Sequence, residues 1–186
     1  MNNYHQIRDN QAPPIRSLKL FEGYGYDKGR SIPWQAAWFL TMNLIFSQWW
    51  CPKGARPRIL KAFGARIGQN VIIRHRVRIY WPWKLSVGDD TWIGEGVWLL
   101  NLEPIDIGAN VCLSQEASLC TGSHDRHSAS FEFDNGPISI KDEVWIGMQA
   151  LVLRGTTVGS GAVVGARATI TRDIEDHVFV RAGETR

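Results

Sequence analysis

The chain has 186 residues, the size of one ordinary domain, which excludes a large multi-domain assembly on one polypeptide. Hydrophobic residues make up 44% and charged residues 21%, which is typical of a globular protein and excludes a disordered or polytopic membrane chain. The net charge of +3 is too small to suggest a nucleic-acid partner, although it would attract an anionic ligand. The 18 glycines and 9 tryptophans are unusual and have to be explained by their positions.

The cysteines and the first residues indicate the compartment. Cys51, Cys112 and Cys120 form no C-x-x-C pair, and their odd number argues against a closed disulfide framework. Residues 1–11 are polar and lack the basic-then-apolar order of a signal peptide. We therefore expect a reducing, cytoplasmic location.

Residues 1–64 precede the repeats described below and are expected to form an N-terminal extension with an apolar, tryptophan-rich helix. The run 31–52 is uncharged and contains four tryptophans. Polar residues such as Gln35 and Asn43 disfavour a transmembrane span. A helix that caps the open first turn of the following domain is favoured. A helix lying peripherally at a membrane interface stays open as the alternative.

From residue 65 onward, an aliphatic residue recurs every six positions over long stretches. A second aliphatic or small residue lies two places before it in every case. Pairs with a period of two indicate short strands whose paired side chains point inward. Three strands per turn predict a triangular β-helix over residues 65–183, whereas an antiparallel sandwich would need this spacing to arise by chance. The fifteen recurring positions are Ile67, Ile73, Ile79, Val87, Ile93, Leu99, Ile107, Leu113, Leu119, Ile140, Ile146, Val152, Val158, Val164 and Ile170.

The corners between these strands also have a signature. Residues that tolerate a positive φ recur three places after the inward aliphatic residue, where a sharp bend is needed. They are Asn70, Asp90, Gly96, Asn110, Gly155 and Gly161.

One long loop interrupts the repeats. Between Leu119 and Ile140, 21 residues replace the usual six, and the inserted segment 121–139 reads TGSHDRHSASFEFDNGPIS. A long insertion in so regular an array is usually functional, and this one carries two histidines, His124 and His127.

Five motifs carry a family resemblance: GARIGQNVIIR at 64–74, YWPWKL at 80–85, LCTGSHD at 119–125, PISIKDEVWIG at 137–147 and TVGSGAVVGARATITRDI at 157–174. With them the sequence resembles the hexapeptide-repeat acyltransferases, whose fold is a left-handed parallel β-helix. It is most similar to O-acetyltransferases of colanic-acid-type exopolysaccharide synthesis, which are related to maltose and galactoside acetyltransferases. The resemblance covers about residues 33–183. The chain departs from the family in ending RAGETR, where relatives have a Gly-x-Pro-Ala segment and a basic tail.

The resemblance implies the reaction and the assembly. Acetyl-CoA would be the acyl donor, no metal would be required, and a sugar or lipid-linked oligosaccharide would be the acceptor. The active sites would lie between the subunits of a homotrimer.

The resemblance makes His124 the general base, because an imidazole can take the hydroxyl proton near neutral pH. The backbone N–H of Met148 would stabilise the oxyanion. His127 is the less favoured base and would otherwise contact the substrate or be a solvated loop residue. Asp125 would orient an imidazole, hold water or be a simple turn residue. Asn101 and Glu103 would bind the acceptor.

The expected coenzyme contacts come from an aromatic side chain, from small residues that allow close approach and from cations that pair with phosphates. They are Trp145, Gly147, Gly165, Ala166, Arg167, Thr171 and Arg172.

A second basic cluster lies in the first turn. Arg74, His75, Arg76 and Arg78 fall within five residues. A solvated outer face is the plainer interpretation of such a cluster on a β-helix, and attraction to an acidic polysaccharide or lipid headgroups is the sharper alternative.

Two other functions stay open at this point. A γ-type carbonic anhydrase has the same fold but needs three histidine ligands on zinc, and His75, His124 and His127 have the wrong spacing for it. A non-catalytic scaffold would bind no coenzyme.

Trp92, Trp98 and Trp145 each precede an inward aliphatic residue and are therefore expected to point outward. So much exposed aromatic surface would suit a subunit interface and the walls of a ligand groove.

Overall fold

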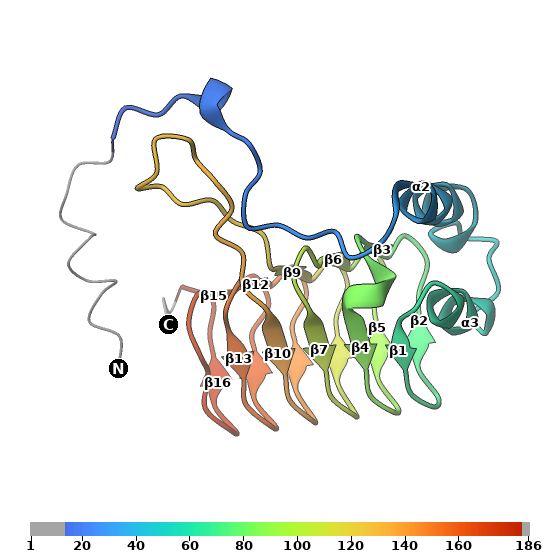
Figure 1. The fold of residues 1–186 in the computed structure, drawn as a ribbon. Coiled ribbons are helices and arrows are strands. Elements are labelled where there is room, and N and C mark those ends of the chain that lie inside the picture. Colours follow the sequence, from blue (N-terminus) through green and yellow to red (C-terminus); the bar gives the residue numbers. More distant parts are fainter. Residues whose placement is uncertain (1–13, 184–186) are drawn as a thin grey trace.

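The structure is a computed structural model that describes residues 14–183. Its main body is a parallel β-helix with three faces, and the chain visits them in the order A, B, C on each turn (Figure 1). Sheet A contains β1 (Arg66–Ile67), β4 (Leu85–Val87), β7 (Ile105–Ile107), β10 (Ile138–Ile140) and β13 (Thr157–Val158). Sheet B contains β2 (Ile72–Ile73), β5 (Trp92–Ile93), β8 (Cys112–Leu113), β11 (Trp145–Ile146), β14 (Val163–Val164) and β16 (Phe179–Val180). Sheet C contains β3 (Arg78–Ile79), β6 (Trp98–Leu100), β9 (Ser118–Cys120), β12 (Leu151–Leu153) and β15 (Thr169–Ile170).

The core is the column of inward side chains that the repeat predicts. The recurring aliphatic residues and the residues two places before them are all at most 8% exposed. Equivalent positions stack directly, as in sheet A, where Val87 pairs with Ile67 on one side and Ile107 on the other. The prediction of a β-helix is therefore confirmed. Each turn buries its apolar surface only against its neighbours, so no turn would be stable alone.

The final turn extends beyond the last residue of the regular series. Ile174 forms a parallel bridge with Val158, and Val180 pairs with Val164. Both side chains are at most 5% exposed. The six-residue count missed them because Ile174 follows Ile170 after four residues.

The corners adopt positive φ where the sequence predicts it. Asn70, Asp90, Gly96, Asn110, Gly155 and Gly161 have φ between 53° and 72°. The same conformation also occurs at larger side chains that the sequence did not mark, with φ between 58° and 61°, although it costs an L-residue about 1–2 kcal/mol. These residues are Arg76, Glu116, Glu143, Gln149, Arg167 and His177.

Helices cover the open end of the β-helix at β1 (Figure 1). They are α2 (Ile32–Thr41), which begins with Pro33 in its first turn, the π-helical turn η2 (Met42–Phe46) and α3 (Ala55–Ala62). Trp38 is 1% exposed, and its Nε1 donates 3.0 Å hydrogen bonds to the carbonyl oxygens of Ile79 and Tyr80. Segment 31–52 thus caps the coil, as favoured from the sequence.

Arg56 ties this cap together. It is 2% exposed, and its guanidinium donates to the carbonyl oxygens of Phe46 at 2.9 Å, Gln48 at 2.6 Å and Ile73 at 3.3 Å. One side chain therefore joins η2, the segment after it and β2. Within residues 14–183, no helix has both the length and the apolar character needed to cross a bilayer.

Residues 14–30 form a segment that we call the N-terminal strap. The strap contains the short helix η1 (Leu18–Leu20) and passes over the inserted loop before the chain reaches α2 (Figure 1). Near α2 it packs on the corner between β3 and β4, which contains the short helix η3 (Pro82–Lys84). There the indole N–H of Trp83 donates to the carbonyl oxygen of Lys28 at 2.7 Å, and burial raises the pKa of Tyr26 to about 12.

Candidate active site

His124 lies in the inserted loop, directly after β9, where the chain turns from sheet C to sheet A. The loop folds back on itself through an antiparallel bridge between His124 and Phe133. The imidazole stacks on Phe131, with ring centroids 4.3 Å apart, and on Phe133, with centroids 5.1 Å apart. Phe21 of the strap meets the imidazole edge-on at 5.7 Å. Three aromatic rings therefore hold the orientation of this side chain.

One hydrogen bond fixes the tautomer of His124. Its Nδ1 lies 2.8 Å from the carbonyl oxygen of Phe131. A carbonyl oxygen can only accept a hydrogen bond, so Nδ1 carries the proton of the neutral ring. Nε2 then keeps its lone pair and is the nitrogen that can take a proton from a substrate.

Glu132 joins the inserted loop to the strap. Its carboxylate accepts backbone N–H bonds from Glu22 at 3.0 Å, Gly23 at 2.9 Å and Tyr24 at 2.8 Å. The bond from Glu22 is the main cause that holds the pKa of Glu132 below its ordinary value, and the bonds from Tyr24 and Gly23 act in the same direction. This role was not predicted from the sequence, in which the alternation Phe131-Glu132-Phe133 is the available signal.

We expect strap docking to depend on the charge of Glu132. Because its pKa is lowered in the folded state, its stabilising contribution is complete above the ordinary value of 4.5 and is lost as the pH falls through the lower folded value. Glu132→Gln should release the strap partly at neutral pH, which would appear as faster hydrogen exchange at the backbone N–H groups of residues 22–24. Glu175→Gln, an exposed carboxylate on another edge, is the control. Unchanged exchange in Glu132→Gln would contradict this role.

The other two candidate residues of the loop make local contacts. Oδ1 of Asp125 accepts the backbone N–H of His127 at 2.8 Å, as in an Asx turn. Nε2 of His127 lies 3.1 Å from Nε of Arg126, which donates to it. Since that lone pair is engaged, His124 is the better placed base of the two.

The expected acceptor residues lie near the same edge as the loop but differ in accessibility. Asn101 is fully buried, and its amide bonds to the backbone of Tyr80 and Trp81, so that it holds the corner between β3 and β4 in place. This structural role differs from the expected contact with an acceptor. Glu103 is half-buried, with Oε2 3.9 Å from Nζ of Lys84.

Most of the expected coenzyme residues lie elsewhere, at the edge between sheets B and C. Met148, Ala166 and Arg167 are exposed there, whereas Thr171 and Arg172 follow β15 on the edge between sheets C and A. Gly147 has a structural reason to be glycine, because a Cβ would lie 2.6 Å from the backbone nitrogen of Ala166 in the next turn. Within one chain, His124 and Met148 therefore occupy different edges of the prism.

The outer face of sheet B carries a groove of about 510 Å³. Trp92 and Trp145 form its aromatic walls, and Lys53 and Arg74 supply positive charge. The indole N–H of Trp145 donates to Oγ of Ser114 at 2.9 Å, which orients the ring. All three tryptophans expected to point outward do so, since Trp92 is 59%, Trp98 37% and Trp145 53% exposed.

The histidines proposed for the zinc alternative are not gathered in the chain. His75 lies on the edge between sheets B and C, with Nε2 3.3 Å from Oε1 of Glu95. Over the part of the chain that the structure describes, no three His, Cys, Asp or Glu side chains are grouped to hold a metal ion.

A parallel β-helix of six-residue repeats, with one long loop that orients a histidine, is the architecture expected of the hexapeptide-repeat transferases. Residues 137–172 match the family model described as bacterial transferase hexapeptide (six repeats). Over 160 residues the chain is 40% identical to WcaF of Escherichia coli (strain K12), described as a candidate colanic acid biosynthesis acetyltransferase, covering 84% of this chain and 86% of WcaF. The chain belongs to this family of hexapeptide-repeat acetyltransferases.

Other relatives agree with this assignment. The galactoside O-acetyltransferase of Escherichia coli (strain K12) is 27% identical over 131 residues, covering 69% of this chain and 64% of its own length. A hexapeptide-repeat acetyltransferase of Vibrio cholerae, solved with acetyl-CoA, shares the fold with a TM-score of 0.75, 24% identity and coverage of 90% of this chain and 93% of its own. A galactoside acetyltransferase solved with coenzyme A also has a TM-score of 0.75, with 22% identity and coverage of 86% and 82%.

Proposed function

We propose that this protein transfers an acetyl group from acetyl-CoA to a sugar hydroxyl in the biosynthesis of an exopolysaccharide. The observation that carries the proposal is the orientation of His124, whose Nδ1 is held by the carbonyl oxygen of Phe131 so that Nε2 can accept a proton. The similarity to WcaF supports the polysaccharide setting, and the relatives solved with acetyl-CoA or coenzyme A support the donor.

The chemistry needs no covalent enzyme intermediate. Nε2 of His124 takes the hydroxyl proton while the hydroxyl oxygen attacks the thioester carbonyl carbon. The backbone N–H of Met148 donates to the oxyanion of the tetrahedral intermediate. When the C–S bond breaks, the imidazolium returns the proton to the thiolate, which leaves as coenzyme A.

The proposed site requires more than one copy of the chain. His124 and Met148 lie on different edges of the same prism, so the base from one subunit would meet the oxyanion donor of a neighbour. Sheet B offers an exposed apolar surface for such packing, with Ile72, Trp92, Trp145 and Phe179 each at least 38% exposed. We therefore propose a homotrimer with three equivalent sites.

The direct experiment is acetyl-CoA turnover with detection of the free thiol, across a panel of sugars and oligosaccharides, together with native mass spectrometry. We expect thiol release that depends on an acceptor and a mass of three chains. Release that is independent of every acceptor, or an active monomer, would contradict the proposal.

We further propose that the cap touches the cytoplasmic membrane surface, where lipid-linked acceptors are found. Although Trp38 and Phe46 are buried, Phe39 and Leu44 on the outer side are each more than 60% exposed. A helical surface with apolar side chains and no charges favours the interface of a bilayer.

The membrane contact predicts co-flotation with phosphatidylcholine–phosphatidylglycerol vesicles. The double variant Phe39→Ser/Leu44→Ser should lose most of the bound fraction, since both side chains are exposed and would enter the interface. Leu18→Ser, 66% exposed in η1 of the strap, is the matched control. Equal flotation of all three proteins, or of none, would exclude this contact.

A further inference from the structure

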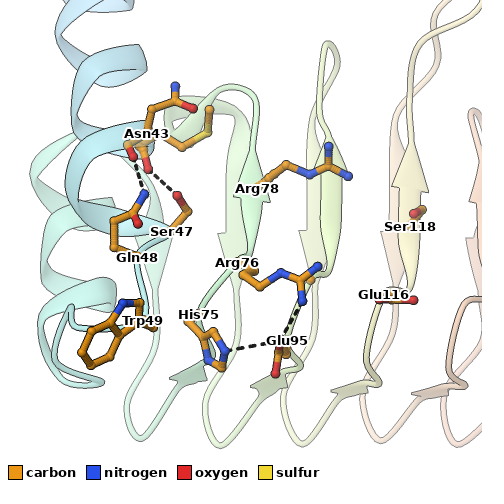
Figure 2. Close-up of a pocket in the computed structure, with 12 residues that line it drawn as sticks. Asn43, Ser47, Gln48, Trp49, His75, Arg76, Arg78, Glu95, Glu116 and Ser118 are labelled. Atoms are coloured by element: carbon orange, nitrogen blue, oxygen red, sulfur yellow. Dashed lines mark hydrogen bonds and ion pairs between the residues drawn. The ribbon is translucent and has the colours of Figure 1, made fainter.

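A second groove, of about 830 Å³, lies along the edge between sheets B and C, between the end of the cap and sheet C (Figure 2). This volume is in the range of small-molecule sites. One wall comes from η2 and the residues after it, and the other from successive turns of the β-helix. The groove is lined by Met42, Asn43, Ser47, Gln48, Trp49, His75, Arg76, Arg78, Glu95, Gly96, Glu116 and Ser118.

The charges in the groove are unequally paired. Glu95 is shared, since its Oε1 lies 3.1 Å from Nη1 of Arg76 and 3.3 Å from Nε2 of His75. Glu116 accepts from the amide of Gln149 at 2.7 Å. Arg78 has no carboxylate partner within residues 14–183. The two arginines formally balance Glu95 and Glu116, but Arg78 is paired with neither of them, so its charge is available to a ligand.

The contact that Arg78 does make leaves its donors available. Its guanidinium carbon lies 4.4 Å from the ring centroid of Trp98, so that the flat face of the cation is occupied. The N–H donors of a guanidinium lie in its plane and can still bind a carboxylate or phosphate in a two-pronged manner. Figure 2 shows the side chains of Arg76 and Arg78 extending in the same direction, with that of Arg76 directed toward Glu95.

The opposite wall suits a sugar ring. Trp49 is 80% exposed and offers an aromatic face to the C–H groups of a pyranose. The amide nitrogens of Asn43 and Gln48 already donate to the carbonyl oxygens of Phe39 at 2.7 Å and Asn43 at 2.5 Å. Their side-chain oxygens remain as acceptors for sugar hydroxyls.

Hydrogen bonds connect the groove to the turns expected to bind the coenzyme. Nε of Arg167 donates to Oε1 of Gln149 at 2.9 Å, and Nε2 of Gln149 donates to Glu116 in the groove. Arg76, Glu116, Gln149 and Arg167 all adopt positive φ in one row along this edge. Positive φ is unfavourable for residues with long side chains, yet four such residues adopt it along this edge.

We infer that this groove binds the acceptor and that the acceptor is an anionic saccharide. Its carboxylate or phosphate would pair with Arg78 and Arg76, and a ring would pack on Trp49. This inference rests on the proposed function, because it names the substrate class of the same enzyme. It also gives a function to His75, Arg76 and Arg78 of the basic cluster of the first turn, whereas Arg74 lines the groove on sheet B.

The test compares matched ligands that differ in one acidic group. NMR titration without acetyl-CoA would use a hexuronic-acid disaccharide and its methyl ester, and separately a hexose 1-phosphate and the free hexose. We expect each acid to bind at least about tenfold more tightly than its neutral partner, as for a hydrogen bond to a charged group. A larger preference for the acid in the uronate pair would identify a carboxylate as the group that the groove binds. A larger preference in the phosphate pair would identify a phosphate. Equal binding within both pairs would overturn the inference.

Arg78→Gln should remove the preference for the acid, and Arg78→Lys should restore part of it. Position 78 is exposed on β3, so neither substitution disturbs the core. Arg66→Gln, an exposed arginine on sheet A, is the control and should bind like the wild type. Wild-type selectivity in Arg78→Gln would overturn the inference.

The two proposals can fail separately. Selective binding of the acid without any acetyl transfer would refute the acetyltransferase proposal while the groove stands. Transfer to neutral sugars that is unaffected by Arg78→Gln would refute the groove while the acetyltransferase proposal stands.

Discussion

His124→Ala is expected to lower kcat for acetyl transfer by about 10²–10⁴-fold, the usual contribution of a positioned general base. The substitution removes the only atom proposed to take the hydroxyl proton, Nε2 of an imidazole that Phe131 and Phe133 hold in place. KM for acetyl-CoA should change little, since the base acts mainly in the transition state. Thiol release at saturating acetyl-CoA measures the effect.

The control for this prediction is His127→Ala in the same loop. Its Nε2 is occupied by Arg126, so activity should stay within a few-fold of the wild type. A large loss in His127→Ala with full activity in His124→Ala would show that the base has been assigned to the wrong histidine.

Trp38→Ala is expected to destabilise the protein by about 3–5 kcal/mol, the range for truncating a buried large aromatic side chain. Trp38 is 1% exposed, packs on Phe46 and Phe63, and donates to two carbonyl oxygens at the end of sheet C. Its loss would open a cavity under the cap and leave those carbonyl groups unsatisfied. Urea unfolding at one fixed protein concentration measures the change, because assembly would couple stability to concentration.

Trp49→Ala provides the matched control, since it removes the same side chain where it is 80% exposed. A surface truncation of this kind should change stability by no more than about 0.5 kcal/mol. Equal destabilisation by the two substitutions would mean that the cap does not depend on the buried indole.

The β-helix could be predicted almost completely because its information is local and repeated. Each six-residue repeat contains its own pair of inward residues, and each turn packs on similar turns above and below it. The corners were harder to predict, since Asn70 and Gly96 are typical of positive φ whereas Arg76 and Gln149 are not. At those residues the stacking of turns imposes the conformation, and the residue type gives no sign of it.

The candidate site was predictable only in part. The loop and His124 stood out because an insertion interrupts a regular count. The aromatic stack around the imidazole involves Phe21, which is more than 100 residues away in sequence and belongs to no repeat. Asn101 looked like a polar residue in a corner insertion, and only the structure shows its amide turned inward to the backbone.

The strap gives the protein an unusual order of assembly. Turns of the coil can form one upon another as the chain is synthesised, but residues 22–24 meet Glu132 across a separation of 108 to 110 residues. The strap is made early and has to wait for a partner that lies more than 100 residues further along the chain, and contacts of such long range form slowly. We expect the turns from β1 to β9 to stack before the strap and the inserted loop orient the histidine, so that a newly made chain acquires much of its shape earlier than its reactivity.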